Sequence, residues 1–239
     1  MRKNGRLTCL IALAALAFSS PASGGTEDDK KASRQEGEYK IYASGREIGV
    51  EKYLIVTAAD SVASSSTLEF RNPGEGPKKV LIETKLEADA QYVPRSYELK
   101  SEVDGQKGNI RGSFAPNQAI FEYSGNGVSI KNGLLVGDRY TVLDTNTFHH
   151  FIFLTRLFKY GAGDKPQKFD VIIPQEKDTG TLQIRELDKE AILVRGKKVN
   201  TTRLLVDSGA LQIQLWVNND RVPLKIAVPE KGIEVIHAQ

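Results

Sequence analysis

Residues 144–161 read DTNTFHHFIFLTRLFKYG and have a helical pattern within a chain that otherwise alternates like β-structure. Asn146 or Thr147 can begin a helix, because a short side-chain oxygen accepts hydrogen bonds from the free N–H groups of the first turn. Gly161 can end it. Apolar side chains lie on nearly every side of such a helix at about 100° per residue. The pattern therefore predicts a buried helix over about residues 147–160, shorter than the roughly 20 residues that cross a bilayer.

The segments on both sides of this helix are typical of β-structure. Short runs rich in Val, Ile, Tyr and Thr extend from about residue 38 to 143 and from 168 to 237, separated by turn residues. Asn126-Gly127 is a strong hairpin signal. The economical fold is mainly β, a curled antiparallel sheet or incomplete barrel that encloses the single apolar helix. Two subdomains divided at the helix remain an alternative.

The N-terminal segment has the composition of an export signal. Residues 1–23 contain three basic residues, an apolar run and then small residues, which is the pattern of a cleaved secretory signal peptide. Residues 24–37 contain almost nothing apolar and predict a disordered lead-in, which leaves 38–239 as a single β-rich domain. Cys9, the only cysteine, lies at the start of the apolar run, whereas a lipidated cysteine follows it. We therefore expect a periplasmic or secreted protein that is not lipidated.

The charge balance limits the classes of partner. Three of the 33 basic residues lie in the signal, so the mature chain has 30 basic and 30 acidic residues and a net charge close to zero. No basic stripe is interleaved with aromatic residues, so we do not expect nucleic acid as a partner. A mature chain without cysteine has no thiolate nucleophile or thiolate metal site. We expect no metal and no cofactor, a chain that does not span the membrane, and we leave the oligomeric state open.

One loop has the composition of an aspartic protease active site. Residues 204–216 read LLVDSGALQIQLW, with Asp207 after an apolar run. This chemistry needs two carboxylates that share a proton across a water. The second Asp-Thr-Gly triplet, at 178–180, follows Glu176-Lys177 rather than an apolar strand end, and lies too near Asp207 in sequence to form a second lobe. A hairpin turn at Asp207 is the simpler interpretation, and a hydrolase that uses Asp207 is the alternative.

Five polar or aromatic residues are candidates for a functional site. The adjacent His149 and His150 point about 100° apart, so they cannot hold one metal as an i, i+4 pair does. His150 falls within the apolar arc and His149 near Arg156 at the polar edge. Asp144 can cap the helix or pair with Arg156 or a histidine, and such a cluster would have perturbed pKa values. Trp216 is more typical of a core or sheet face than of a ligand contact. No catalytic residue is assigned.

Several motifs together resemble a family of exported bacterial proteins that form a domain of unknown function. They are an Asp-x-Asn before a His-containing helix, a Pro-Gln after the next strand, and a late Leu-Trp-Val hairpin followed by an apolar-x-Val-Pro strand. The matching residues are Asp144, Asn146, His149, His150, Arg156, Pro174, Gln175, Trp216 and Pro229. The resemblance covers about residues 38–237. It implies an exported, β-rich fold and assigns no activity.

Three functional hypotheses follow from these patterns. The first is a non-enzymatic envelope protein that binds a lipid-like ligand or a partner protein in a concave sheet, unless the helix fills that concavity. The second is a hydrolase at Asp207, or an acid–base site around Asp144, His149 and His150. The third is a structural role in envelope assembly through strands added at an open sheet edge.

Overall fold

The computed structural model describes residues 32–72, 78–137, 139–163 and 165–238. Within these ranges fifteen strands form one sheet around one α-helix, α1 (His150–Leu157). The strands are β1 (Ser33–Ala43), β2 (Arg46–Thr57), β3 (Ser61–Asn72), β4 (Lys78–Asp89), β5 (Pro94–Val103), β6 (Gln106–Ala115), β7 (Gln118–Gly125), β8 (Val128–Leu135), β9 (Tyr140–Val142), β10 (Gln167–Ile173), β11 (Asp178–Val194), β12 (Lys197–Asp207), β13 (Gln212–Val217), β14 (Pro223–Val228) and β15 (Ile233–His237). Two 3-10 turns, η1 (Pro174–Glu176) and η2 (Pro229–Lys231), follow β10 and β14.

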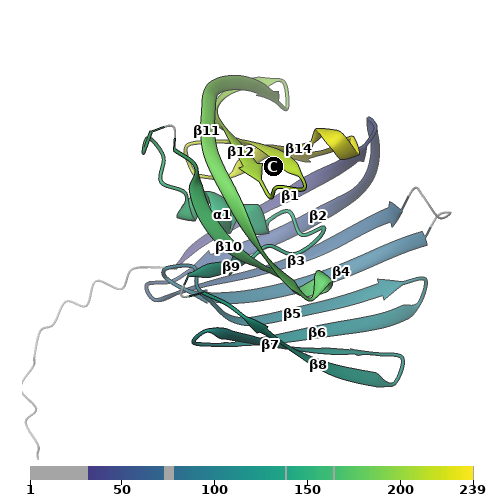
Figure 1. Ribbon diagram of the computed structural model, residues 1–239. Coiled ribbons are helices and arrows are strands. Elements are labelled where there is room, and N and C mark those ends of the chain that lie inside the picture. The colour runs from purple at the N-terminus through teal and green to yellow at the C-terminus, as the bar shows by residue number, and fades with distance from the viewer. Residues whose placement is uncertain (1–31, 73–77, 138, 164, 239) are drawn as a thin grey trace, which may run out of the picture. The chain divides into compact units, whose positions relative to one another are not determined.

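The strand order shows that the curled sheet is not closed into a barrel. It runs β8-β7-β6-β5-β4-β3-β2-β1-β15-β14-β13-β12-β11-β10-β9, so β8 and β9 are the two edges and do not pair with each other. The pairings are antiparallel except for β9 with β10, which is parallel. Figure 1 shows the sheet bending round, with α1 inside the curve. The predicted mainly β fold, an incomplete barrel enclosing one helix, is confirmed.

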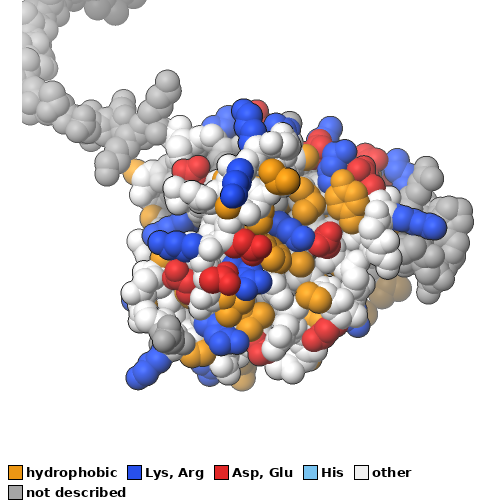
Figure 2. Space-filling model, turned by 90° about the horizontal axis from the view of Figure 1, so that it is seen from above, with side chains coloured by type: hydrophobic (Ala, Val, Ile, Leu, Met, Phe, Trp, Pro, Cys, Tyr) orange, Lys and Arg blue, Asp and Glu red, His pale blue; other side chains and the backbone are white. Residues whose placement is uncertain are grey.

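The core lies on the concave face of the sheet. In β1 and β2 alternate side chains are buried, because a strand has a period of two residues. In β1 these are Tyr39 and Ile41, and in β2 they are Tyr53 and Ile55, all at most 4% exposed. The surface seen from above in Figure 2 carries acidic and basic side chains mixed with apolar ones.

Helix α1 is buried as predicted but is shorter than the predicted 147–160. Six of its eight residues, His150 to Thr155, are buried. Residues before it form turns instead, and Asn146 adopts a left-handed backbone with φ of 60°, which Asn tolerates better than most residues. At the other end Phe158 is extended, and its buried ring packs against Tyr160. The flanking aromatic residues thus reach the core from irregular backbone.

The sheet begins earlier than the predicted start at residue 38. Strand β1 starts at Ser33, which pairs with Thr57 of β2. A Cβ at Gly37 would lie 2.5 Å from the Tyr53 hydroxyl, so the strand passes the core at a residue without a side chain. The predicted lead-in is therefore wrong for residues 33–37, because backbone pairing needs no apolar side chains. The predicted signal peptide, 1–23, and residues 24–31 lie outside the described residues.

Among the described residues, no helix combines the length and the apolar content that crossing a bilayer requires.

Candidate functional site

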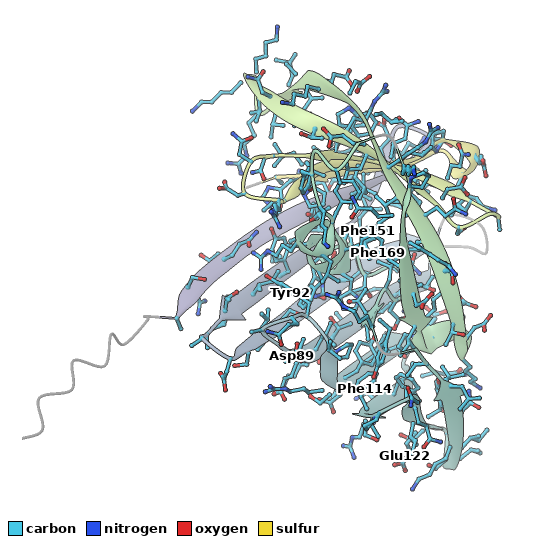
Figure 3. The ribbon with its side chains drawn as sticks, turned by 60° about the vertical axis from the view of Figure 1, so that its left-hand side comes forward. Asp89, Tyr92, Phe114, Glu122, Phe151 and Phe169 are labelled. Atoms are coloured by element: carbon cyan, nitrogen blue, oxygen red, sulfur yellow. The ribbon has the colours of Figure 1, made fainter. Side chains whose placement is uncertain are left out.

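An apolar cavity of about 510 Å³ lies within the curl, beside the N-terminal end of α1. Its walls come from strands far apart in the sequence, for example Leu68 of β3, Val171 of β10 and Ile226 of β14. Phe151 lies on the helix and lines the same cavity (labelled in Figure 3). The cavity is also lined by seven partly buried apolar side chains that pack against the core: Ile48, Phe70, Leu143, Phe148, Ile173, Ile213 and Ile233. The helix therefore does not fill the concavity at this end.

Polar groups are few around the apolar cavity. Thr145, Asn146 and Ser208 supply hydroxyl and amide groups, and Lys231 of η2 supplies the one ammonium group among its lining residues. Asp144 also lines it. An apolar wall with a few polar groups is the usual composition of a site for small apolar molecules, and the volume lies within the range of about 300–1,000 Å³ of such sites.

Glu51 of β2 holds the start of the helix. One carboxylate oxygen accepts hydrogen bonds from the backbone N–H groups of Phe148, at 2.9 Å, and His149, at 3.1 Å. The other lies 2.7 Å from Nδ1 of His149, and both side chains are fully buried. A carboxylate is favourable here because the N–H groups at a helix start are unpaired and the helix dipole is positive. Glu51 therefore does the capping that the sequence assigned to Asn146 or Thr147.

His149 connects this cap to a buried polar layer of the sheet. Its Nε2 lies 3.2 Å from the Ser64 hydroxyl, and its ring stacks on Tyr53. The Tyr53 hydroxyl in turn lies 2.8 Å from Nε2 of His237, and burial raises the pKa of Tyr53 to about 12. The predicted position of His149 at a polar edge near Arg156 is wrong, because Glu51 draws its ring into the core.

Asp144 is buried and fully engaged with the protein. Its carboxylate accepts hydrogen bonds from the Tyr97 hydroxyl, from the backbone N–H of Thr145 at 2.9 Å and from that of Gln175 at 3.0 Å. Burial raises the pKa of Asp144, and these hydrogen bonds oppose the rise. Burial and the nearby carboxylate raise the pKa of Tyr97 well above its usual value. The bond to Gln175 brings together the Asp-x-Asn and Pro-Gln motifs.

His150 is a buried neutral base rather than an exposed one. Its Nδ1 accepts a hydrogen bond from the backbone N–H of Asp144 at 3.3 Å, so the ring proton belongs on Nε2. Nε2 is buried without a hydrogen-bond partner in the described residues. Burial, with a smaller contribution from His149, lowers the pKa of His150 well below its ordinary value. The predicted pairing of Asp144 with a histidine is not formed by its carboxylate, and the contact with His150 is made by the Asp144 backbone N–H.

Arg156 and Trp216 lie apart from this cluster. The guanidinium of Arg156 donates to the Gln35 side chain and, at 3.5 Å, to the Tyr92 hydroxyl. The predicted Asp–His–Arg cluster is therefore not formed. Trp216 is buried outside the main core cluster, and its indole N–H donates to Glu190 of the long strand β11 at 2.7 Å.

Asp207 is a turn residue. One of its carboxylate oxygens accepts a hydrogen bond from the Gly209 N–H at 2.7 Å, and Gly209 has a φ of 80°. The turn joins β12 to β13, as the hairpin interpretation predicts. Asp178 makes a similar short-range bond to the Thr179 N–H and is exposed. Neither carboxylate has the other as a partner, so the described chain shows no shared-proton pair at Asp207.

The sequence interpretation missed Glu51, Tyr97 and Lys231. Glu51 had a usable signal, since Glu51, Tyr53 and Ile55 alternate along one face of β2 and place a carboxylate among core residues. Tyr97 and Lys231 had none, because their neighbours come from distant strands. The described residues contain no group of three or more His, Cys, Asp or Glu side chains placed to hold a metal ion.

The comparisons with known proteins bear on the fold. A β-barrel-like protein of the domain of unknown function DUF1849, from Brucella abortus, is similar over 85% of this chain and 93% of that chain, with 12% identity and a TM-score of 0.54. A DUF1089-family protein from Pseudomonas aeruginosa is matched over 76% of this chain and 90% of that chain, with 12% identity and a TM-score of 0.45. No family model and no curated protein matches the sequence. The likeness to the first protein shows a shared β-barrel-like fold.

Proposed function

We propose that the protein is an exported envelope protein that binds the apolar part of an amphiphilic, lipid-like ligand in the apolar cavity. One observation carries this proposal: seven partly buried apolar side chains line a single cavity of about 510 Å³ that is open to solvent. A ligand that covers these side chains removes their apolar area from water, which favours binding by about 25 cal/mol per Å². The signal-like residues 1–23 support export.

The polar groups at the cavity place the ligand's polar end. Asp144 has three hydrogen-bond donors inside the protein, so its carboxylate serves the fold. The Ser208 hydroxyl is likewise bonded to the backbone of Leu211, and the exposed Lys231 remains to contact a polar or anionic head. The ligand class is therefore a molecule with an apolar body and a polar end.

Binding of the neutral apolar dye N-phenylnaphthylamine tests the proposal. Ile213→Trp fills the apolar cavity and should weaken dye binding by at least about tenfold, which corresponds to about 1.4 kcal/mol. Leu193→Trp is the matched control, because Leu193 is 75% exposed on β11 and does not line the cavity. Leu211→Trp, in a surface turn at the cavity, repeats the test without disturbing a strand. Unchanged binding in both cavity variants would contradict the proposal.

A second candidate function is envelope assembly by strand addition at β8. Four of the six large apolar side chains that are exposed in the described chain belong to β7 and β8: Ile120, Val128, Ile130 and Leu135. Strand β8 is also an edge, with backbone groups free to pair with an added strand. A photo-crosslinking residue at Ile130 should capture a discrete partner in cells, and the same residue at Leu193 should not. Equal capture from both positions would contradict this role.

A further inference from the structure

A second cavity, of about 380 Å³, lies near the C-terminal end of α1. Its apolar surface comes from Val93, Tyr140, Leu157 and Phe169, the last labelled in Figure 3. These residues come from the β4–β5 connection, β9, the helix and β10. None of the residues that line it lines the apolar cavity. We call it the cationic cavity because of the charges around it.

Three basic side chains surround the cationic cavity without acidic partners. Arg139, Lys159 and Lys168 all line it and are exposed. Within the described chain, none of the three makes a side-chain hydrogen bond, an ion pair or a stacking contact. The one carboxylate in the lining, Asp170, accepts a hydrogen bond from the Thr181 hydroxyl at 2.9 Å. Among the described lining residues, three basic side chains therefore stand against one carboxylate, which leaves the cavity with an excess of positive charge.

A buried hydroxyl gives an independent sign that a ligand belongs here. Thr141 of β9 lines the cationic cavity and is 1% exposed, and its Oγ1 is buried with no hydrogen-bond partner in the described residues. Buried polar atoms are nearly always partnered, so an unpartnered one in a native core needs an explanation. A valine would fill the same space without burying an unpaired hydroxyl. A hydroxyl retained beside unpaired cations is suited to donate to an anion.

We propose that the cationic cavity binds a small organic anion, with an apolar or aromatic body and a carboxylate, sulfonate or phosphate group. The body packs against Tyr140 and Phe169, and the acidic group lies among Arg139, Lys159 and Lys168. This site is separate from the one in the proposed function and does not depend on it. An anion is favoured over a neutral molecule because the three cations outnumber the single carboxylate of Asp170, and a bound negative charge reduces the repulsion that remains among them.

Titration with anilinonaphthalene sulfonate, an aromatic anion, tests the charge requirement. Lys159→Gln combined with Lys168→Gln should weaken binding by about tenfold or more, and added salt should weaken binding to the parent protein. Lys197→Gln combined with Lys198→Gln removes the same charge from the exposed start of β12 and should leave the affinity unchanged. An equal loss in both double variants would overturn the proposal, because it would report net charge alone.

Thr141→Val separates ligand recognition from folding. The variant should melt at the same temperature as the parent or higher, because it removes an unpartnered hydroxyl, and yet bind the sulfonate more weakly. Thr141→Ser should keep the affinity. Unchanged affinity in both the Thr141→Val and the lysine variants would overturn the proposal.

The two cavities are told apart by their probes. The neutral dye should respond to Ile213→Trp and not to the lysine changes, and the sulfonate should show the reverse. If the sulfonate responds only to Ile213→Trp, it occupies the apolar cavity and the cationic site is refuted, whereas the first proposal stands. If the neutral dye fails to bind and the sulfonate responds to Lys159 and Lys168, the first proposal fails and this one stands.

Discussion

The acidic side chains at the N-terminal end of helix α1 and the basic side chains near its C-terminal end differ in how far the protein itself satisfies them. At the N-terminal end, the carboxylates of Glu51 and Asp144 each accept three hydrogen bonds from the protein. Near the C-terminal end, the Thr141 hydroxyl and three cations have no such partner among the described residues. A buried polar group whose bonds are complete stabilises the fold. Groups beside a cavity whose bonds are incomplete are free to bind something outside the chain.

Glu51→Ala should be the most damaging change at the N-terminal end. It leaves His149 buried without its partner and two N–H groups without an acceptor. Breaking a buried pair from one side costs about 3–5 kcal/mol, measured as the free energy of unfolding in urea. Glu51→Gln should cost less, since an amide oxygen still accepts. Glu47→Ala, at the exposed end of the same strand, is the control; it removes an exposed ion pair with Lys40 and should cost at most about 1 kcal/mol. A similar cost for both alanine variants would remove the contrast between the two helix ends.

Burial of the helix could be predicted because its own residues are apolar on all sides. The cap could not, because Glu51 lies 98 residues before His149 and only the curl of the sheet brings them together. Local rules therefore favoured Asn146 and Thr147, which lie next to the helix in sequence.

The candidate site was predictable to the same limited extent. Asp144 and His150 are six residues apart and are joined by a hydrogen bond from the Asp144 backbone N–H to the His150 ring. Arg156 instead donates a hydrogen bond to Gln35, in a segment whose composition indicated disorder. Neither cavity could be predicted from one sequence. A cavity is space left between strands that are distant in the sequence, and no residue pattern records it.

The pH dependence of stability tests whether His150 is held neutral. Its pKa in the folded protein is well below the ordinary value, so below about pH 6.5 the unfolded chain binds a proton that the folded chain does not. Stability from this residue is complete above about pH 6.5 and is lost as the pH falls, by at most about 1.4 kcal/mol per pH unit. Asp144 has a raised pKa and acts in the opposite sense, gaining stability as the pH falls toward its unfolded value near 3.9.

His150→Asn should remove this slope between about pH 7.5 and about pH 5.5, because an amide oxygen can accept the Asp144 N–H and does not titrate. Urea unfolding of both proteins at the two pH values gives the measurement. A slope that survives the substitution would show that another group carries the acid sensitivity, and that the N-terminal end is not the source.

Arg221→Ala should show that the C-terminal end of the helix depends little on its own cap. Arg221 is exposed and donates to the Arg156 carbonyl at 2.8 Å, where a cation also suits the helix dipole. Its removal should cost about 0.3–1 kcal/mol, several-fold less than Glu51→Ala. Arg221→Lys should restore most of that difference at low salt. A cost above about 3 kcal/mol would make the two ends equivalent.

Asp207→Ala should have a small effect on stability and none on either end of the helix, because Asp207 belongs to neither. It removes the turn bond to the Gly209 N–H and a weaker one from Gln212, worth about 0.5–1.5 kcal/mol together with their hydration. Asp207→Asn keeps an oxygen for the same turn and should be close to the parent in stability. Under acidic conditions the parent and both variants should leave an unfolded peptide substrate intact. Cleavage by the parent that Asp207→Asn abolishes would restore the hydrolase hypothesis and assign this turn, rather than either end of the helix, as the active part of the molecule.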